Sequence, residues 1–204
     1  MICVGYFSER LMRKRTAAAA LLLIALCVGA ATPVSAQQPQ PETQTQPPAV
    51  IKLKGLDGKV YDSTAMKGEV LVVSFGATWC TPCTWELVAI EELKEEYAGK
   101  PVRFLWVSIE GEKQTSDNLL RHYAKERKLT IPVLRDPEAQ AFSQFSSSTR
   151  IPVVVFFDRD GKHVAPVHRG MSSEISEYKK LVRTRVDALL KAGETPAAAG
   201  AVGK

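Results

Sequence analysis

The residues best suited to chemistry are two cysteines in the stretch Trp79-Cys80-Thr81-Pro82-Cys83. The stretch follows a hydrophobic run and stands at the first turn of a predicted helix, so both thiols can meet across that turn and close a small disulfide ring. The partial positive charge of the helix N-terminus favours a thiolate and lowers the pKa of Cys80. We expect Cys80 to attack a substrate disulfide and the deeper Cys83 to resolve the mixed disulfide.

Three other interpretations of this cysteine pair stay open but have less support. A zinc site needs two further ligands, and the sequence offers no second cysteine pair and no histidines at ligand spacing. A structural disulfide stabilises a protein by closing a long loop, which a two-residue spacer does not provide. A thiol peroxidase needs a catalytic cysteine inside its own loop motif, and neither cysteine has a threonine three residues before it.

A strand before the pair and a helix after it must position the two thiols. Val70–Phe75 is a short apolar run typical of a buried strand. From about Pro82 to Tyr97, apolar residues gather near one face and most charged residues lie opposite, which predicts a helix. Gly99 supplies the stop of that helix.

The other segments alternate between strand and helix patterns. A hairpin turning at Asp57-Gly58 precedes the first buried strand. The elements expected after the first helix are a strand over Val102–Ile109, a helix over Asp117–Lys128, a short helix from Asp136 to Phe145, a strand over Val153–Phe157, an edge strand from Lys162 to His168 and a helix over Glu174–Leu190. This order predicts an α/β fold: a three-layer sandwich with a mixed central sheet, flanking helices and an N-terminal hairpin extension.

The N-terminus has the pattern of a secretory signal peptide. Arg13-Lys14-Arg15 is followed by an aliphatic run from Ala17 to Ala31 and by a small-residue cleavage site ending at Ala36. The run is shorter than the roughly 20 residues that span a bilayer, and an uncleaved leader that tethers the chain to the membrane is one alternative. A lipoprotein modified at Cys27 is a second, with less support because the bulky Leu26 precedes that cysteine. The expected regions are a signal peptide over 1–36, a Pro/Gln-rich spacer over 37–48, a folded domain over 49–191 and a flexible C-terminal tail over 192–204.

Composition excludes several classes of protein. Of the 204 residues, 45% are hydrophobic and 24% are charged, which is the balance of a globular protein rather than of a disordered chain or a polytopic membrane protein. The formal net charge of +5 comes partly from the basic N-terminus, and no basic stripe with interleaved aromatic residues follows it. Nucleic acid is therefore not an expected partner.

Several stretches carry a resemblance to a known family. Besides the cysteine pair, they are Asp57-Gly58-Lys59, Phe75-Gly76-Ala77-Thr78-Trp79-Cys80, Pro132-Val133-Leu134-Arg135-Asp136-Pro137 and Phe157-Asp158-Arg159-Asp160-Gly161-Lys162. Over about residues 50–190 the chain is similar to the TlpA/ResA-like thiol–disulfide oxidoreductases of the thioredoxin-like superfamily. The resemblance implies a thioredoxin-like fold, a Cys80–Cys83 redox disulfide, a periplasmic location and a reductase role, often in cytochrome c maturation.

The resemblance also implies partners for this activity. They are a disulfide-containing protein substrate and a membrane thiol donor that restores the reduced pair. We expect no cofactor, no metal and a monomer. The alternatives are a redox-inert or metal-handling binding module on the same fold, and a thiol peroxidase. The dipeptide Thr81-Pro82 does not indicate whether the pair reduces or oxidises its substrates.

Further site residues are implied only by this resemblance. Ile151-Pro152 matches the position of the cis-proline loop, which faces the cysteines and holds the substrate chain by backbone hydrogen bonds. Trp79, Thr81 and Pro82 would contribute to the same substrate site.

Glu86 stands three residues after Cys83, where ResA-like members carry a glutamate near the active site. Residues i and i+3 share a helix face, so burial there would raise the pKa of Glu86 and let it carry a proton to or from Cys83. A solvated helix glutamate is the alternative. Four positions depart from the family. Ser74 replaces a buried aspartate of thioredoxin, and Gly76 replaces an aromatic residue of many relatives. Val88 replaces the proline that commonly follows the helix glutamate by two, and Trp85 is unusual beside the pair. We expect Trp85 to pack inside the protein rather than to contact a partner.

Overall fold

The computed structural model describes residues 48–193. In chain order its elements are β1 (Lys52–Lys54), β2 (Val60–Asp62), β3 (Val70–Gly76), α1 (Thr81–Glu96), β4 (Val102–Ser108), α2 (Asp117–Glu126), β5 (Val133–Arg135), α3 (Gln140–Ser143), β6 (Val153–Phe157), β7 (His163–Arg169) and α4 (Ile175–Ala192). The predicted signal peptide, and nearly all of the predicted spacer and tail, lie outside the described residues. Within residues 48–193, no helix combines the length and the apolar character needed to cross a membrane.

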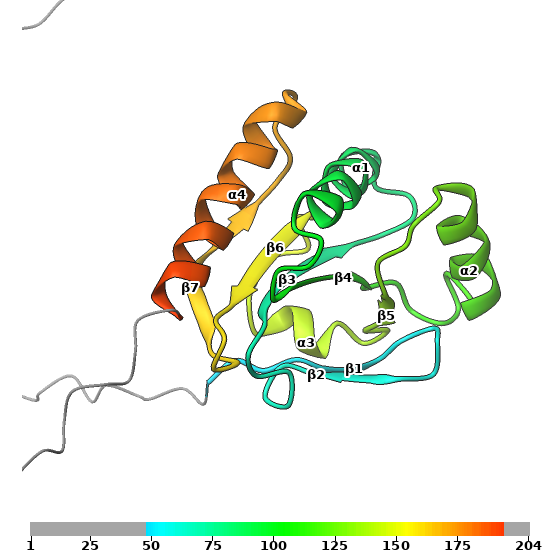
Figure 1. Cartoon of the computed structure of the whole chain (residues 1–204). Helices are drawn as coiled ribbons and strands as arrows, with labels where there is room; N and C mark the ends of the chain where they lie inside the picture. Colours follow the sequence, from blue (N-terminus) through cyan, green and yellow to red (C-terminus); the bar gives the residue numbers. More distant parts are fainter. Residues whose placement is uncertain (1–47, 194–204) are drawn as a thin grey trace, which may run out of the picture. The chain divides into compact units, whose positions relative to one another are not determined.

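A five-stranded mixed sheet forms the centre of the domain, with its strands in the order β5-β4-β3-β6-β7 (Figure 1). β3 runs parallel to β4 and antiparallel to β6. All seven residues of β3 are buried, as its continuous apolar run predicts. β7 is an edge strand, where the proline at position 166 removes no hydrogen bond from the interior of the sheet.

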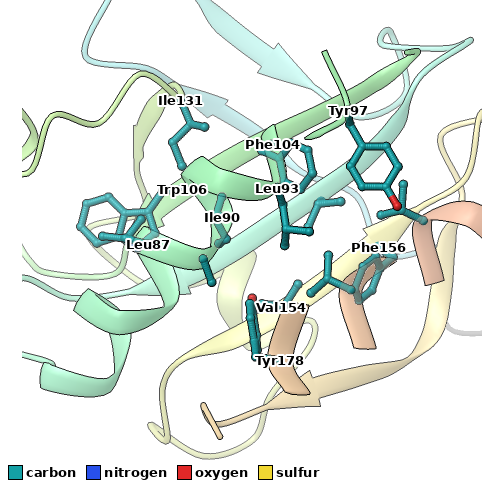
Figure 2. Packing of buried hydrophobic residues seen from close by; sticks show 14 of the residues in the cluster. Leu87, Ile90, Leu93, Tyr97, Phe104, Trp106, Ile131, Val154, Phe156 and Tyr178 are labelled. Atoms are coloured by element: carbon teal, nitrogen blue, oxygen red, sulfur yellow. The ribbon is translucent and has the colours of Figure 1, made fainter. Parts of the chain in front are cut away.

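Two hydrophobic clusters cover the two faces of this sheet. Because successive residues of a strand point to opposite faces, Val72 packs with α1, α2 and α4, whereas Leu71 and Val73 pack with α3 and the β1–β2 hairpin. Figure 1 shows α1 and α4 over one face, with α3 and the hairpin on the other. Figure 2 shows the first cluster, in which Leu87 and Ile90 of α1 lie among residues of the sheet and of α4. The predicted three-layer sandwich is confirmed.

β5 is a strand that the sequence analysis did not predict. Val133–Arg135 pairs in parallel with Trp106–Ser108 of β4 and forms one edge of the sheet. A strand of three residues is too short to show a repeating pattern, so its existence depends on pairing with a segment that lies far away in the sequence.

The helix predicted from Asp136 to Phe145 is reduced to the single turn of α3. The carboxylate of Asp136 accepts hydrogen bonds from the backbone N–H groups of Ala141 and Phe142, at 3.2 and 2.8 Å. These contacts tie the carboxylate to the start of α3, across a turn in which Ala139 has a φ of 52°. The left-handed conformation of Ala139 interrupts the helix that the sequence pattern predicts.

Candidate active site

The two cysteines lie at the start of α1, shortly after the central strand β3, as predicted. Cys80 is the N-cap of α1, and its sulfur accepts a hydrogen bond from the backbone N–H of Cys83 at 3.2 Å. The two residues form a disulfide, with their Cα atoms 5.2 Å apart. Cys80 is 5% exposed and Cys83 is fully shielded. A substrate can therefore approach the sulfur of Cys80 more readily than that of Cys83.

The segment predicted to be the cis-proline loop lies beside the disulfide. The Ile151–Pro152 peptide bond is cis, as predicted. Ile151 packs against the two cysteines, and β6, which begins directly after Pro152, pairs with the end of β3. The other three residues assigned to the substrate site, Trp79, Thr81 and Pro82, are exposed at the start of α1. Ile151 thus contacts the cysteines from the loop, whereas Trp79, Thr81 and Pro82 are their exposed neighbours in the chain.

Glu86 is fully buried, one turn further along α1 than Cys83. Its carboxylate accepts hydrogen bonds from the hydroxyls of Ser74, at 2.5 Å, and Tyr178, at 2.9 Å. Burial raises the pKa of Glu86 to about 7, although both hydrogen bonds favour the ionised form and lower the pKa. The prediction of a buried carboxyl group with a raised pKa is confirmed, and the alternative of a solvated helix glutamate is wrong.

Both hydrogen-bond donors to Glu86 come from other elements of the fold. Ser74 lies in β3, where the sequence analysis noted only that an aspartate is missing. Tyr178 lies in α4, separated from Glu86 by 92 residues of sequence. Burial also raises the pKa of Tyr178 well above its usual value, so its hydroxyl keeps its proton and donates it to the hydrogen bond. Nothing in the local sequence around Tyr178 indicates this contact.

Sequence analysis also missed Glu110, a buried carboxylate that binds the segment of chain just before Cys80. Glu110 is 2% exposed and accepts hydrogen bonds from the backbone N–H of Thr78 at 2.8 Å and from its hydroxyl at 2.7 Å. The hydroxyls of Ser108 and Thr115 donate to the same carboxylate, at 3.1 and 2.7 Å. This network fixes the backbone two residues before Cys80, because both the main chain and the side chain of Thr78 are held.

Gly76 departs from the family pattern for a packing reason. A β-carbon on Gly76 would lie 2.8 Å from Nε1 of Trp106 and 3.2 Å from the sulfur of Cys83. Both approaches are closer than ordinary contact in a packed interior, so a side chain here would have to displace the indole or the sulfur. The absence of a side chain at Gly76 lets Trp106 lie beside the disulfide.

The expectation that Trp85 packs inside the protein is wrong. Its side chain is 47% exposed, on the face of α1 opposite the sheet. Val88, one turn further on, is 50% exposed, and Trp79 before the disulfide is 69% exposed. Large apolar side chains are therefore presented to solvent on the same helix end that carries the reactive pair. The pattern of apolar residues along α1 did not show that Trp85 and Val88 are exposed. Their neighbours Leu87 and Ala89 are also apolar, but these two are buried.

Comparisons with known proteins bear on the family of this chain. The family model described as Redoxin matches residues 36–182. The thioredoxin-like protein YneN of Bacillus subtilis is 37% identical over 84 residues, which are 41% of this chain and 48% of YneN, so the match spans about half of that protein. The thiol-disulfide oxidoreductase ResA of Bacillus thuringiensis subsp. konkukian is 25% identical over 128 residues, which are 62% of this chain and 71% of ResA.

The fold is also similar to that of a solved relative. The crystal structure of the exposed lipoprotein thioredoxin Etrx1 of Streptococcus pneumoniae matches with a TM-score of 0.57 and 27% identity, covering 69% of this chain and 100% of Etrx1. The residues matched by the Redoxin model include the Cys80–Cys83 disulfide, Glu86 and the Ile151–Pro152 loop. The chain belongs to the Redoxin family, as a ResA/TlpA-like thiol–disulfide oxidoreductase with a thioredoxin-like fold.

Proposed function

We propose that this oxidoreductase reduces disulfide bonds in protein substrates in the periplasm. The observation that carries the proposal is the asymmetry of the site: Cys80 lies at the outer side, Cys83 is fully shielded, and Glu86 lies buried one helical turn beyond it. The signal-peptide pattern of residues 1–36 supports export. The exposed lipoprotein thioredoxin Etrx1, whose fold is similar, supports a role outside the cytoplasm.

The cycle begins with the reduced pair. The Cys80 thiolate attacks one sulfur of the substrate disulfide, so a mixed disulfide forms and the first substrate sulfur leaves as a thiolate that takes a proton from water. Cys83 then attacks the Cys80 sulfur, which closes the Cys80–Cys83 bond and releases the second substrate thiol. Two electrons have passed from the pair to the substrate. A dithiol donor at the membrane reverses the change and becomes a disulfide itself.

Glu86 supplies the acceptor that the second step needs. Cys83 must lose its proton to attack, but its sulfur has no contact with solvent. A carboxyl group with a pKa near 7 can take up and return a proton at neutral pH, because neither of its protonation states is strongly favoured. Thiol and carboxyl group titrate as a coupled pair, since a thiolate beside a carboxylate is disfavoured by repulsion.

The surface around the disulfide fits a protein chain as substrate. Trp79 and Trp85 expose large aromatic faces near Cys80, and aromatic side chains of this kind are enriched at protein interfaces. The Ile151–Pro152 loop lies on the other side of the pair and offers backbone groups to an extended substrate segment. A substrate chain would therefore lie between the start of α1 and this loop.

The cysteine roles are tested by trapping the mixed disulfide. Cys83→Ser should accumulate a Cys80-linked mixed disulfide with a protein substrate such as insulin, because the resolving thiol is gone. Cys80→Ser should trap far less and should not turn over. Equal trapping through Cys83 in the Cys80→Ser variant would contradict these roles. Wild-type protein should reduce insulin with a dithiol donor; consumption of hydrogen peroxide without insulin reduction would identify a peroxidase instead.

A further inference from the structure

The indole N–H of Trp106 is a buried hydrogen-bond donor that lacks an acceptor. Trp106 is fully buried in β4, and no group within residues 48–193 accepts a hydrogen bond from its Nε1. Nearly all buried polar groups in native proteins have a partner, because leaving one unpaired is costly. An unpaired donor of this kind next to a redox centre suggests that its partner forms in the other redox state.

The position of this N–H identifies that partner. Trp106 Nε1 and the Cys83 sulfur both lie close to the position that a β-carbon of Gly76 would take, at 2.8 and 3.2 Å from it, so the two atoms are near neighbours. The indole is held in this orientation, since its ring stacks on Tyr123 with centroids 5.6 Å apart and an interplanar angle of 18°. Trp106 and Tyr97 lie at opposite ends of the same hydrophobic cluster (Figure 2). Tyr97 is the C-cap of α1 and therefore marks the end far from the disulfide.

We propose that the Trp106 N–H donates a hydrogen bond to the Cys83 sulfur when the pair is reduced. A dithiol donor supplies two electrons and two protons, the Cys80–Cys83 bond breaks, and the donor's own sulfurs join in a disulfide. Once the bond between them is broken, the two sulfurs move apart to nonbonded contact, and the Cys83 sulfur can shift toward the indole N–H near Gly76. The inference rests on the redox cycling of the pair and not on whether the protein acts as a reductase.

The charge of the reduced site favours this contact. A thiolate is a stronger acceptor than a sulfur in a disulfide, because hydrogen bonds to ionised groups are shorter and stronger. Glu86, on the same helix, cannot stabilise a Cys83 thiolate when it is ionised, since both groups are then negative. An indole N–H carries no formal charge and cannot be an acceptor, so Trp106 can only stabilise the anion. Glu86 would accept the proton of Cys83, and Trp106 would donate a hydrogen bond to the thiolate sulfur that remains.

Trp106 should therefore shift the redox equilibrium of the pair toward the reduced form. The test replaces Trp106 with benzothienylalanine, which keeps the ring shape but has sulfur in place of the N–H. Equilibration of the full chain against a dithiothreitol redox buffer should show the disulfide favoured about tenfold more than in wild type, which equals about 30 mV for this two-electron couple. Trp106→Phe should move the equilibrium in the same direction.

Phe104→Leu is the matched control, because Phe104 lies on the same face of β4, is 2% exposed and has no donor to lose. It should leave the redox equilibrium within about twofold of wild type. In an NMR spectrum of the wild-type protein, reduction should also move the Trp106 indole N–H signal downfield.

An unchanged equilibrium for the benzothienylalanine variant would overturn the proposal while leaving the proposed function intact. An equal shift in Phe104→Leu would also overturn it, because packing alone would then account for the effect. A wild-type pair that fails to cycle at all would contradict both this inference and the proposed function.

Discussion

Two glutamates near opposite ends of α1 contact the same neighbouring helix, α4, in contrasting surroundings. Glu86 is buried, and its partner on α4 is the neutral hydroxyl of Tyr178. The Glu96 side chain is 36% exposed and forms ion pairs with Arg183 at 2.6 Å and Lys179 at 2.7 Å. Burial raises the pKa of Glu86 to about 7, whereas hydrogen bonds from Arg183 and then Lys179 lower that of Glu96 to about 2.

The contrast separates a carboxylate that stabilises the fold from one suited to chemistry. A carboxylate paired with cations stays ionised at any physiological pH, so it can hold two helices together but cannot exchange a proton. A buried carboxylate with only hydroxyl partners loses that charge easily and can change protonation state at neutral pH. The chain places the first kind at the end of α1 far from the disulfide and the second kind one helical turn after Cys83. The following predictions test this difference.

The largest expected effect is on the pH dependence of stability. The folded protein binds the Glu86 proton more tightly than the unfolded chain does. The stabilisation that comes from this tighter proton binding is therefore complete below the unfolded pKa of 4.5 and is lost as pH rises toward the folded pKa of about 7. The loss should be about 3 kcal/mol in the free energy of unfolding. Urea unfolding of the oxidised wild type and Glu86→Gln between pH 4 and 8 would measure it as the difference between the two curves.

In that comparison, Glu86→Gln should become progressively more stable relative to wild type as pH rises, because Gln cannot ionise in the buried site. Glu96→Gln is the control over the upper part of this range: its difference from wild type should stay constant between pH 6 and 8, since the folded pKa of about 2 and the unfolded value of 4.5 both lie below that range. Parallel curves for Glu86→Gln as well would mean that Glu86 has an ordinary pKa in the folded protein.

The next effect concerns the rate of disulfide exchange. Glu86→Gln keeps the shape of the side chain but removes the ionisable proton, so resolution of the mixed disulfide by Cys83 should slow by about tenfold or more at neutral pH. The first attack by Cys80 should change less. Stopped-flow measurement of both steps between pH 5 and 9 would separate them, with Glu96→Gln again as the control. Superimposable pH profiles for wild type and Glu86→Gln would leave water as the proton acceptor for Cys83.

The sequence was sufficient for those parts of the site that depend on local spacing. The Cys80–Cys83 pair follows an apolar run and begins a helix. Glu86 was singled out by the family resemblance, and helix spacing placed it on the same face as Cys83. The position of the Ile151–Pro152 loop came from the family resemblance. The order of the main elements could be predicted for the same reason, because each long strand or helix has its own pattern of apolar residues.

Contacts between distant segments could not be predicted in this way. Tyr178 reaches Glu86, and Glu110 reaches Thr78, only because the fold brings separate elements together. The sequence did not indicate that Trp106 lies near the disulfide, since a tryptophan in an apolar strand is typical of any protein core. β5 was missed for a related reason: its three residues form a strand only by pairing with β4. The exposure of Trp85 shows the opposite error, since an apolar residue on a buried helix was assumed to pack.

The smallest expected effect is on the ion pairs of Glu96. Glu96→Gln should lower the free energy of unfolding at pH 7 by less than about 1 kcal/mol, because solvent screens partly exposed ion pairs. Since the folded pKa of Glu96 is lowered, this contribution is present above the unfolded value of 4.5 and is lost as pH falls toward about 2. Thermal unfolding in 0.1 M and 1 M NaCl would test the origin of the effect, because salt should remove most of it. A loss of several kcal/mol that salt does not change would mean that Arg183 and Lys179 act on Glu96 in a site shielded from water. The difference in pKa between Glu96 and Glu86 would then depend on the two cations alone and not on the exposure of Glu96.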